Sequence, residues 1–326
     1  MSSPDRNIAL EMVRATEAAA MSASRWMGRG NKEGVDGAAV NAMRFVLNTV
    51  RMDGLVVIGE GEKDNAPMLF NGEKLGLGGE PKVDIAVDPV DGTRLTALGL
   101  QNAVSVVAFA ERGTMYDPKH IFYMEKIATG PAAADVIDIN APISDNIIAV
   151  AKALGKRPED VTIILLDRPR HEKLIAEIRQ VSARLRLIMD GDVAGALATC
   201  KSDSGIDLLV GVGGSPEAVI TACAIKCVGG NMQCKLWPRN EDEANKCKEN
   251  GMDLKQVLTL NDLVASDNVY FAATGVTDGD WLNGVKYVGD TIKTSSLVMR
   301  SESGTIRYID AEHKYKKLDM LGDVNY

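Results

Sequence analysis

Asp88-Pro89-Val90-Asp91-Gly92-Thr93 is the stretch that decides how this chain is interpreted. It follows the alternating, β-branched run 82–87, which predicts a strand, and it precedes a helix-like segment. Two carboxylates three residues apart, at the end of a strand and the opening of a helical turn, can converge on one hard cation. Gly92 permits close approach of the backbone to a ligand, and the Thr93 hydroxyl is expected beside the metal-held oxygens. This arrangement fits metal-dependent phosphoryl transfer, which needs cations to hold phosphate and water.

The same hexapeptide is also typical of an ordinary turn, because Asp and Gly are common in turns and at helix N-caps. On its own it favours neither interpretation, and the rest of the chain has to decide between them.

Composition describes an ordinary enzyme-sized globular protein. The chain has 326 residues, 45% hydrophobic and 25% charged, which suits roughly two domains of about 100–200 residues each. The net charge of −8 is spread along the chain, and the absence of a basic stripe argues against nucleic-acid binding. No apolar run approaches the ~20 residues that span a bilayer, and residues 2–7 do not resemble a signal peptide. We expect a cytoplasmic protein with no membrane partner.

The cysteine and histidine residues do not indicate a disulfide framework, a zinc site or a catalytic triad. Five cysteines, an odd number, argue against a disulfide framework. Cys223 and Cys227 lie one helical turn apart, but no Cys-x-x-Cys or nearby histidine completes a zinc site, so buried core thiols are expected. The histidines His120, His171 and His313 are scattered and suggest neither a triad nor a zinc cage.

Hydrophobic patterns predict alternating strands and helices. In the first half we expect helices over 8–28 and from Asp36 onward, and strands over 55–59, 82–87 and 103–110. A segment bounded by Gly130-Pro131 and Ala141-Pro142, which are typical of turns and loops, separates the two halves of the chain. The predicted domains are therefore 1–140 and 141–326. In the second half we expect strands over 161–166 and 206–212, helices over 171–185, through Leu197 and after Glu217, and β-rich sequence over 268–310. This order implies a layered α/β fold with functional groups at strand ends.

Acidic residues recur just past predicted strands or at helix starts. Oxygen-only clusters of this kind suit Mg²⁺ or Mn²⁺ rather than zinc or copper. Each carboxylate taken singly is typical of a solvated or capping side chain, and their shared placement is what favours a metal site. The set comprises Asp36, Glu60, the pair Asp88 and Asp91, and Glu217.

Three further segments can recognise phosphate or sugar. Gly213-Gly214-Ser215-Pro216-Glu217 predicts a strand–loop–helix turn with Ser215 as N-cap, whose free N–H groups can bind phosphate, although a tight structural turn explains it equally. Asp190-Gly191-Asp192 suits hydrogen bonds to sugar hydroxyls or a capping turn. Arg168-Pro169-Arg170 can clamp a phosphate, or can be surface charge at a helix entry.

The hexapeptide at 88–93 resembles the metal-binding signature of the lithium-sensitive phosphatase superfamily, which includes inositol monophosphatases and fructose-1,6-bisphosphatases. More specifically, the chain resembles bacterial class II fructose-1,6-bisphosphatases nearly end to end. The supporting stretches are 26–32 (WMGRGNK), 36–40 (DGAAV), 57–62 (VIGEGE), 66–69 (APML), 124–126 (MEK) and 213–217 (GGSPE).

The resemblance implies an α/β/α/β/α sugar-phosphatase fold and hydrolysis of the 1-phosphate of D-fructose 1,6-bisphosphate in gluconeogenesis, with Mn²⁺ or Mg²⁺ as cofactor. By matching positions, Asp36 and Glu60 would hold one metal, while Asp88, Asp91 and Glu217 would hold the other. Thr93 would assist the attacking water, supported by Lys32 and Asp64. The implied substrate contacts are Asp91, Gly92, Thr93, Tyr123, Arg168, Pro169, Arg170, Asp190, Gly191, Asp192 and Gly214.

Some alternatives stay open at this point. Asn31 stands where many relatives carry an acidic residue, and a longer segment over 113–120 makes Tyr116 a rival to Tyr123. Another sugar or inositol phosphatase of the superfamily, a nucleotide 3′-phosphatase, and a non-catalytic phosphosugar-binding regulator are the competing functions. Sedoheptulose 1,7-bisphosphate shares the reacting end of the substrate and is a candidate second substrate. The family also implies a homo-oligomer.

Overall fold

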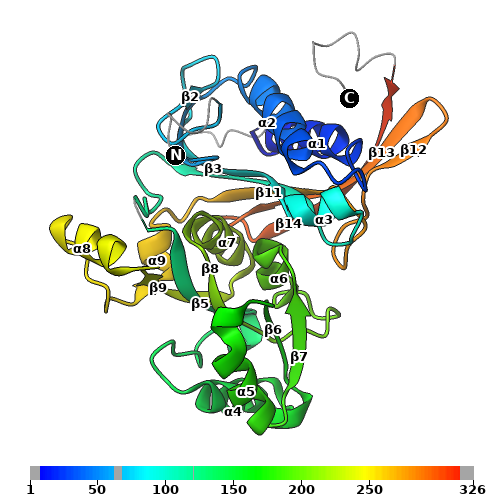
Figure 1. Cartoon of the computed structure of the whole chain (residues 1–326). Coiled ribbons are helices and arrows are strands. Elements are labelled where there is room, and N and C mark those ends of the chain that lie inside the picture. Colours follow the sequence, from blue (N-terminus) through cyan, green and yellow to red (C-terminus); the bar gives the residue numbers. More distant parts are fainter. Residues whose placement is uncertain (1–7, 62–67, 120, 316–326) are drawn as a thin grey trace. The chain divides into compact units, whose positions relative to one another are not determined.

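The computed structural model describes residues 8–61, 68–119 and 121–315, which form two compact units (Figure 1). One unit comprises Met1–Met115 with Ser266–Tyr326, and the other comprises Tyr116–Ala265. This division differs from the expected boundary at residue 140, because the C-terminal strands return to the sheet of the N-terminal segment. The β-rich sequence at 268–310 is therefore part of the first unit.

The first unit is built on an eight-stranded sheet in the order β12-β13-β11-β4-β3-β1-β2, with β14 paired to β13. Inside this sheet, β3 is parallel to β1 and antiparallel to β4, and its residues are mostly buried. β4 in turn pairs with β11, so the C-terminal hairpins extend the sheet. The strands are β1 (Asp53–Ile58), β2 (Lys74–Leu75), β3 (Lys82–Asp91), β4 (Val104–Glu111), β11 (Tyr270–Gly275), β12 (Lys286–Val288), β13 (Thr291–Arg300) and β14 (Thr305–Lys314).

Two long helices pack together on this sheet, as both ribbon views show. α1 (Ile8–Ser24) contacts β4, β11 and β13, and its run of buried alanines permits close packing against α2 (Lys32–Leu47). α2 begins at Lys32, four residues before the expected start, because the Asn31 side chain accepts a hydrogen bond from Gly34 N and caps the helix. A short third helix, α3 (Thr93–Leu98), follows β3.

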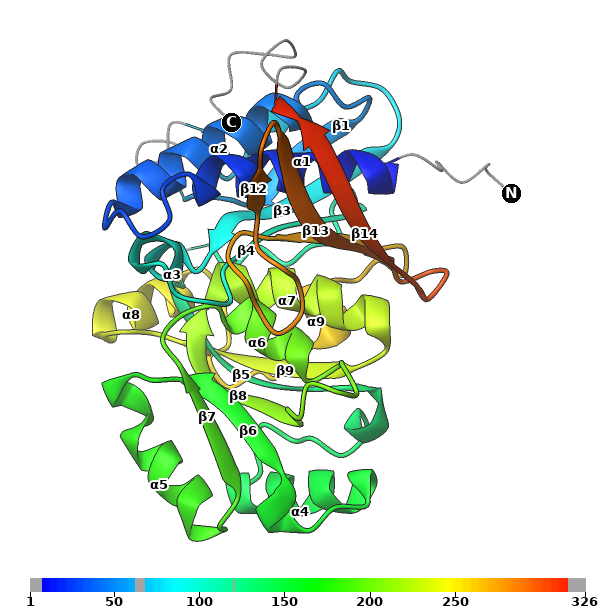
Figure 2. The same ribbon diagram turned by 90° about the vertical axis from the view of Figure 1, so that its right-hand side faces the viewer.

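The second unit is a six-stranded sheet in the order β10-β9-β5-β8-β6-β7 with helices on both faces (Figure 2). α4 and α5 cover β6 and β8 through an apolar cluster that includes Ile147, Ile163 and Ile178, while α6 and α7 pack on the opposite face. The strands are β5 (Tyr123–Thr129), β6 (Thr162–Leu166), β7 (Arg184–Ile188), β8 (Leu208–Gly214), β9 (Asn231–Trp237) and β10 (Leu258–Thr259). The helices are α4 (Ile143–Leu154), α5 (Glu172–Gln180), α6 (Asp192–Ala198), α7 (Ser215–Val228), α8 (Glu241–Glu249) and α9 (Leu260–Leu263).

The α/β fold class is confirmed, with local corrections. β3 continues through Asp91 rather than ending at Val87. The helix expected over 171–185 ends at Gln180, because β7 already begins at Arg184. All five cysteines are free thiols, four of them buried, as expected. Within the described part of the chain, no helix is both long enough and apolar enough to cross a membrane.

Candidate functional site

A β-bulge explains how the hexapeptide at 88–93 presents two carboxylates together. Asp88 pairs with Val106 and Asp91 pairs with Val104, so three steps along β3 match two along β4. In a regular strand, residues three apart point to opposite faces, but one extra residue in the bulge restores the same face. Pro89 fits there because it has no N–H to contribute to the ladder. The register therefore directs Asp88 and Asp91 to one side of the sheet.

Thr93 and Asp36 join the end of this strand to α2. Thr93 Oγ1 donates a hydrogen bond to Asp36 Oδ1 at 2.9 Å and lies 3.1 Å from Val90 O. Burial raises the pKa of Asp36, and the hydrogen bond from Thr93 opposes that rise. Gly92, at φ 98°, supplies the left-handed turn that brings α3 directly off the strand. Adjoining elements therefore carry these groups: Asp36 lies on α2, Asp88 and Asp91 lie on β3, and Thr93 begins α3.

The other first-unit residues expected in the site are Glu60, Lys32 and Asp64. Glu60 follows β1, exposes its side chain, and donates its backbone N–H to Leu69 O at 2.9 Å. Lys32 is an exposed first residue of α2. Asp64 lies outside the described residues. Among the residues that are described, no three or more Asp, Glu, His or Cys side chains lie close enough to hold a metal ion.

In the second unit, the arginines after β6 are held by specific acceptors. Arg168 Nη2 donates to Asp190 Oδ1 at 2.5 Å, which pairs two of the expected substrate contacts with each other. Arg170 donates twice to Val212 O, at 3.1 and 2.7 Å, and its guanidinium lies 4.7 Å from the centre of the Tyr123 ring. Tyr123 itself pairs with Gly214 across β5 and β8. These contacts bring the expected sugar- and phosphate-binding residues of this unit into one region.

His171 organises that region although its sequence context gave no sign of it. Its ring accepts a hydrogen bond from Val212 N at Nε2 (2.7 Å), so Nδ1, 2.7 Å from Leu166 O, must carry the proton. Burial lowers the pKa of His171, which favours this neutral tautomer. The imidazole therefore ties the end of β6 to β8 beside the two arginines.

Glycines at the end of β8 make room for buried charges. A Cβ at Gly213 would lie 2.2 Å from Asp192 Oδ2, and one at Gly214 would lie 1.8 Å from Glu217 Oε2. Asp192 Oδ2 accepts a hydrogen bond from Lys126 Nζ at 2.6 Å. Burial and the Asp192 carboxylate raise the pKa of Glu217, whose Oε2 is buried without a hydrogen-bond partner in the described structure.

The helix start at α7 differs from expectation. Gly214 is the N-cap and makes no side-chain bond, while Ser215 is the first helical residue and donates its Oγ hydrogen bond to Ile121 O. Ser215 therefore anchors α7 to the segment before β5 and does not cap the helix. Pro216, expected at the first helical position, is the second residue of α7 and so still lies in its first turn.

Sequence reasoning gave no role to Lys126, although the stretch 124–126 supports the family resemblance, and it gave no bracing role to His171. The available signal for Lys126 was its position two residues after Met124, because alternate residues of a strand lie on the same face and Met124 is fully buried. No side-chain motif marks His171, because its partners are backbone groups: Leu166 O, five residues before it, and Val212 N, 41 residues after it.

Comparison with known proteins gives a consistent result. The family model described as bacterial fructose-1,6-bisphosphatase, glpX-encoded, matches residues 6–313. The chain is 45% identical over 327 residues to fructose-1,6-bisphosphatase 1 class 2 of Escherichia coli (strain K12), covering 96% of this chain and 97% of that protein. Fructose-1,6-bisphosphatase class 2 of Shigella flexneri matches with the same identity and coverage. The chain therefore belongs to the bacterial, glpX-type class II fructose-1,6-bisphosphatase family.

Proposed function

We propose that this protein hydrolyses the 1-phosphate of D-fructose 1,6-bisphosphate to fructose 6-phosphate and inorganic phosphate, in gluconeogenesis. The observation that carries the proposal is the β3 bulge, which directs Asp88 and Asp91 to one face beside the Thr93–Asp36 hydrogen bond. Family membership over nearly the whole chain supports the substrate. Phosphoryl transfer needs this kind of site, because catalysis there is mostly positioning and charge stabilisation.

The donor set fits a hard divalent cation. It consists only of carboxylates, and Glu217 contributes a buried oxygen that lacks a hydrogen-bond partner among the described residues. Family resemblance alone assigns Asp36 and Glu60 to one Mn²⁺ or Mg²⁺, and Asp88, Asp91 and Glu217 to the other. When bound, such ions neutralise the phosphate charge and lower the pKa of a bound water.

The chain's own groups would handle the nucleophile and the leaving group. Thr93 Oγ1 donates to Asp36 Oδ1, so its lone pairs are available to accept a hydrogen bond from the attacking water. Water oxygen forms the new bond to phosphorus as the bond to the sugar oxygen breaks; the water gives up one proton, and the sugar oxygen takes up one proton and leaves as an alcohol. Lys32 and Asp64 are assigned to this region by family resemblance.

Substrate recognition is assigned to the second unit. Arg168, Arg170 and Tyr123 would bind phosphate, while Asp190, Gly191, Asp192 and the Gly214 backbone would bind the sugar. Tyr123 is favoured over Tyr116 because the Arg170 guanidinium lies over its ring and because Tyr123 pairs with Gly214 across β5 and β8. Tyr116 instead hydrogen-bonds through its backbone to Leu263.

A substrate panel tests the proposal. Phosphate release is measured with fructose 1,6-bisphosphate, sedoheptulose 1,7-bisphosphate, inositol 1-phosphate and a nucleoside 3′,5′-bisphosphate, each with Mn²⁺ and with Mg²⁺. We expect the highest kcat/KM for fructose 1,6-bisphosphate. A higher value for inositol or nucleotide phosphate would reassign the substrate, and binding of fructose 1,6-bisphosphate without turnover would favour a phosphosugar-binding regulator.

A further inference from the structure

Lys126 is a buried cation that none of the steps above uses. It lies in the middle of β5 and is 3% exposed. Lysine is almost never fully buried unless it is paired, because removing the ammonium from water is costly. A lysine on the inward face of a central strand therefore calls for a partner.

The partner is Asp192, the first residue of α6. Lys126 Nζ donates to Asp192 Oδ2 at 2.6 Å, and both side chains are largely removed from solvent. A carboxylate has a second oxygen, here Oδ1, which can accept further hydrogen bonds. The ammonium thus holds one carboxylate oxygen and leaves the other available to a ligand hydroxyl.

The sheet is shaped around this pair. Lys126 is opposite Gly211 on β8, and Gly213, two residues further on, lies on the same face. A Cβ at Gly213 would lie 2.2 Å from Asp192 Oδ2 and 3.0 Å from Lys126 Nζ. A small cavity lined in part by Lys126, His171, Asp192 and Gly213 adjoins the pair. Only glycine at position 213 leaves space for the two side chains as they stand.

A second carboxylate, that of Glu217, also stabilises the charged form of Lys126. Burial lowers the pKa of Lys126, but the Asp192 and Glu217 carboxylates raise it, and the net direction is upward. Both carboxylates favour the ammonium form of Lys126, whose hydrogen-bond and ion-pair partner is Asp192 at the start of α6.

We propose that Lys126 is a positioning residue for sugar recognition: it fixes the Asp192 carboxylate so that Oδ1 accepts a hydrogen bond from a substrate hydroxyl. This inference rests on the proposed function, since it concerns the same substrate site. It predicts that losing Lys126 weakens binding of the sugar phosphate more than it slows turnover.

The test compares Lys126→Met, Asp192→Asn and the double variant. We measure KM and kcat for fructose 1,6-bisphosphate, binding of fructose 6-phosphate by calorimetry, and thermal midpoints. Each single change should raise KM and the dissociation constant about tenfold while kcat changes less than threefold. Because both changes remove one interaction, the double variant should be no worse than the worse single variant. Lys126→Met should lower the thermal midpoint by roughly 10 °C, and the double variant should recover part of it, since the Asp192 charge that paired with the ammonium is removed as well.

Lys156→Met is the matched control, because Lys156 Nζ also pairs with an aspartate, Asp207, at 2.5 Å in the same unit. It should lower stability while leaving KM unchanged. Unaltered KM and binding in folded Lys126→Met or in the double variant would overturn the inference, as would a double variant whose KM rises by the product of the single effects. If the wild-type protein neither hydrolyses fructose 1,6-bisphosphate nor binds fructose 6-phosphate, the proposed function itself fails.

Discussion

Glu17 should make the stability of the protein fall as pH rises through neutrality. This carboxylate lies in α1, is 6% exposed, and accepts a hydrogen bond from Thr294 Oγ1 at 3.1 Å. Burial raises the pKa of Glu17 to about 7, against smaller opposing effects of Thr294 and Arg14. His313 on β14 lies 3.8 Å from the same oxygen, and its own pKa is lowered by burial. The folded state therefore holds a proton on Glu17 that the unfolded chain releases near pH 4.5.

The size of the change in stability follows from the difference between the pKa of Glu17 in the folded state and in the unfolded state. A carboxyl whose folded pKa is above its unfolded pKa contributes stability at low pH and loses it as pH rises to the folded pKa. For values of 4.5 and about 7, the loss between pH 5 and pH 8 is about 2.5 kcal/mol. The buried His171 and the partly buried His313 act in the opposite direction, because their pKa values are lowered in the folded state and they take up protons on unfolding at acid pH. The wild-type profile alone therefore mixes both effects.

Glu17→Gln isolates the contribution of the carboxylate. Urea unfolding of both proteins at pH 5, 6, 7 and 8 gives the difference in the free energy of unfolding. We expect the variant to gain about 2.5 kcal/mol relative to wild type across this range and to be the more stable protein at pH 8. Parallel pH profiles for the two proteins would refute the reasoning, because they would mean that Glu17 is ionised in the folded state at all these pH values.

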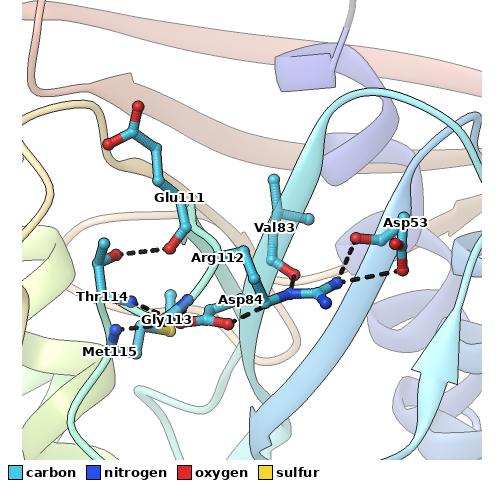
Figure 3. A network of polar contacts seen from close by, with 8 residues as sticks. All are labelled: Asp53, Val83, Asp84, Glu111, Arg112, Gly113, Thr114 and Met115. Atoms are coloured by element: carbon cyan, nitrogen blue, oxygen red, sulfur yellow. Dashed lines mark hydrogen bonds and ion pairs between the residues drawn. The ribbon is translucent and has the colours of Figure 1, made fainter.

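Three further changes test other parts of the structure. Asp84→Ala removes the carboxylate that accepts hydrogen bonds from the backbone N–H groups of residues 113–115, at 2.7, 2.9 and 3.1 Å (Figure 3). It should lower the free energy of unfolding by about 3 kcal/mol in urea titrations, and a change under ~1 kcal/mol would show that these hydrogen bonds contribute little to stability. Arg170→Ala should raise KM for fructose 1,6-bisphosphate about tenfold with kcat retained, and a pure turnover defect in steady-state kinetics would contradict its role. Gly214→Ala forces the Glu217 carboxylate away from its position 1.8 Å from the new Cβ, so the Mn²⁺ concentration for half-maximal activity should rise at least tenfold; an unchanged metal titration would remove Glu217 from the metal site.

Much of the architecture was predictable because hydrophobic periodicity reports burial directly. The run 55–59 and the run 103–110 both appear as strands within two residues of expectation. The helix before them, α2, was placed four residues late because the N-cap role of Asn31 depends on a local hydrogen bond rather than on periodicity. The unit boundary was misplaced because β11 pairs with β4 across more than 150 residues, which no local pattern reports.

For the candidate site, motifs identified several residues, but their arrangement depends on contacts between segments distant in sequence. Motif spacing identified the Asp88 and Asp91 pair, but the bulge that gives them one face requires the register of β3 against β4. The pairing of Arg168 with Asp190 joins two segments that the sequence analysis treated separately. Lys126 escaped attention because a single lysine in a strand is ordinary unless its face is known to be buried.

The most direct test of the central claim is phosphate release from fructose 1,6-bisphosphate by metal-stripped protein, titrated with Mn²⁺ and with Mg²⁺ beside Asp88→Ala. The wild-type protein should be inactive when stripped and should regain turnover with one or both ions. Asp88→Ala should stay folded by circular dichroism and lose at least 99% of that activity, because one carboxylate of the bulge pair is gone. A folded wild-type protein that remains silent with either ion, or an Asp88→Ala variant that keeps its metal-restored turnover, would contradict the account.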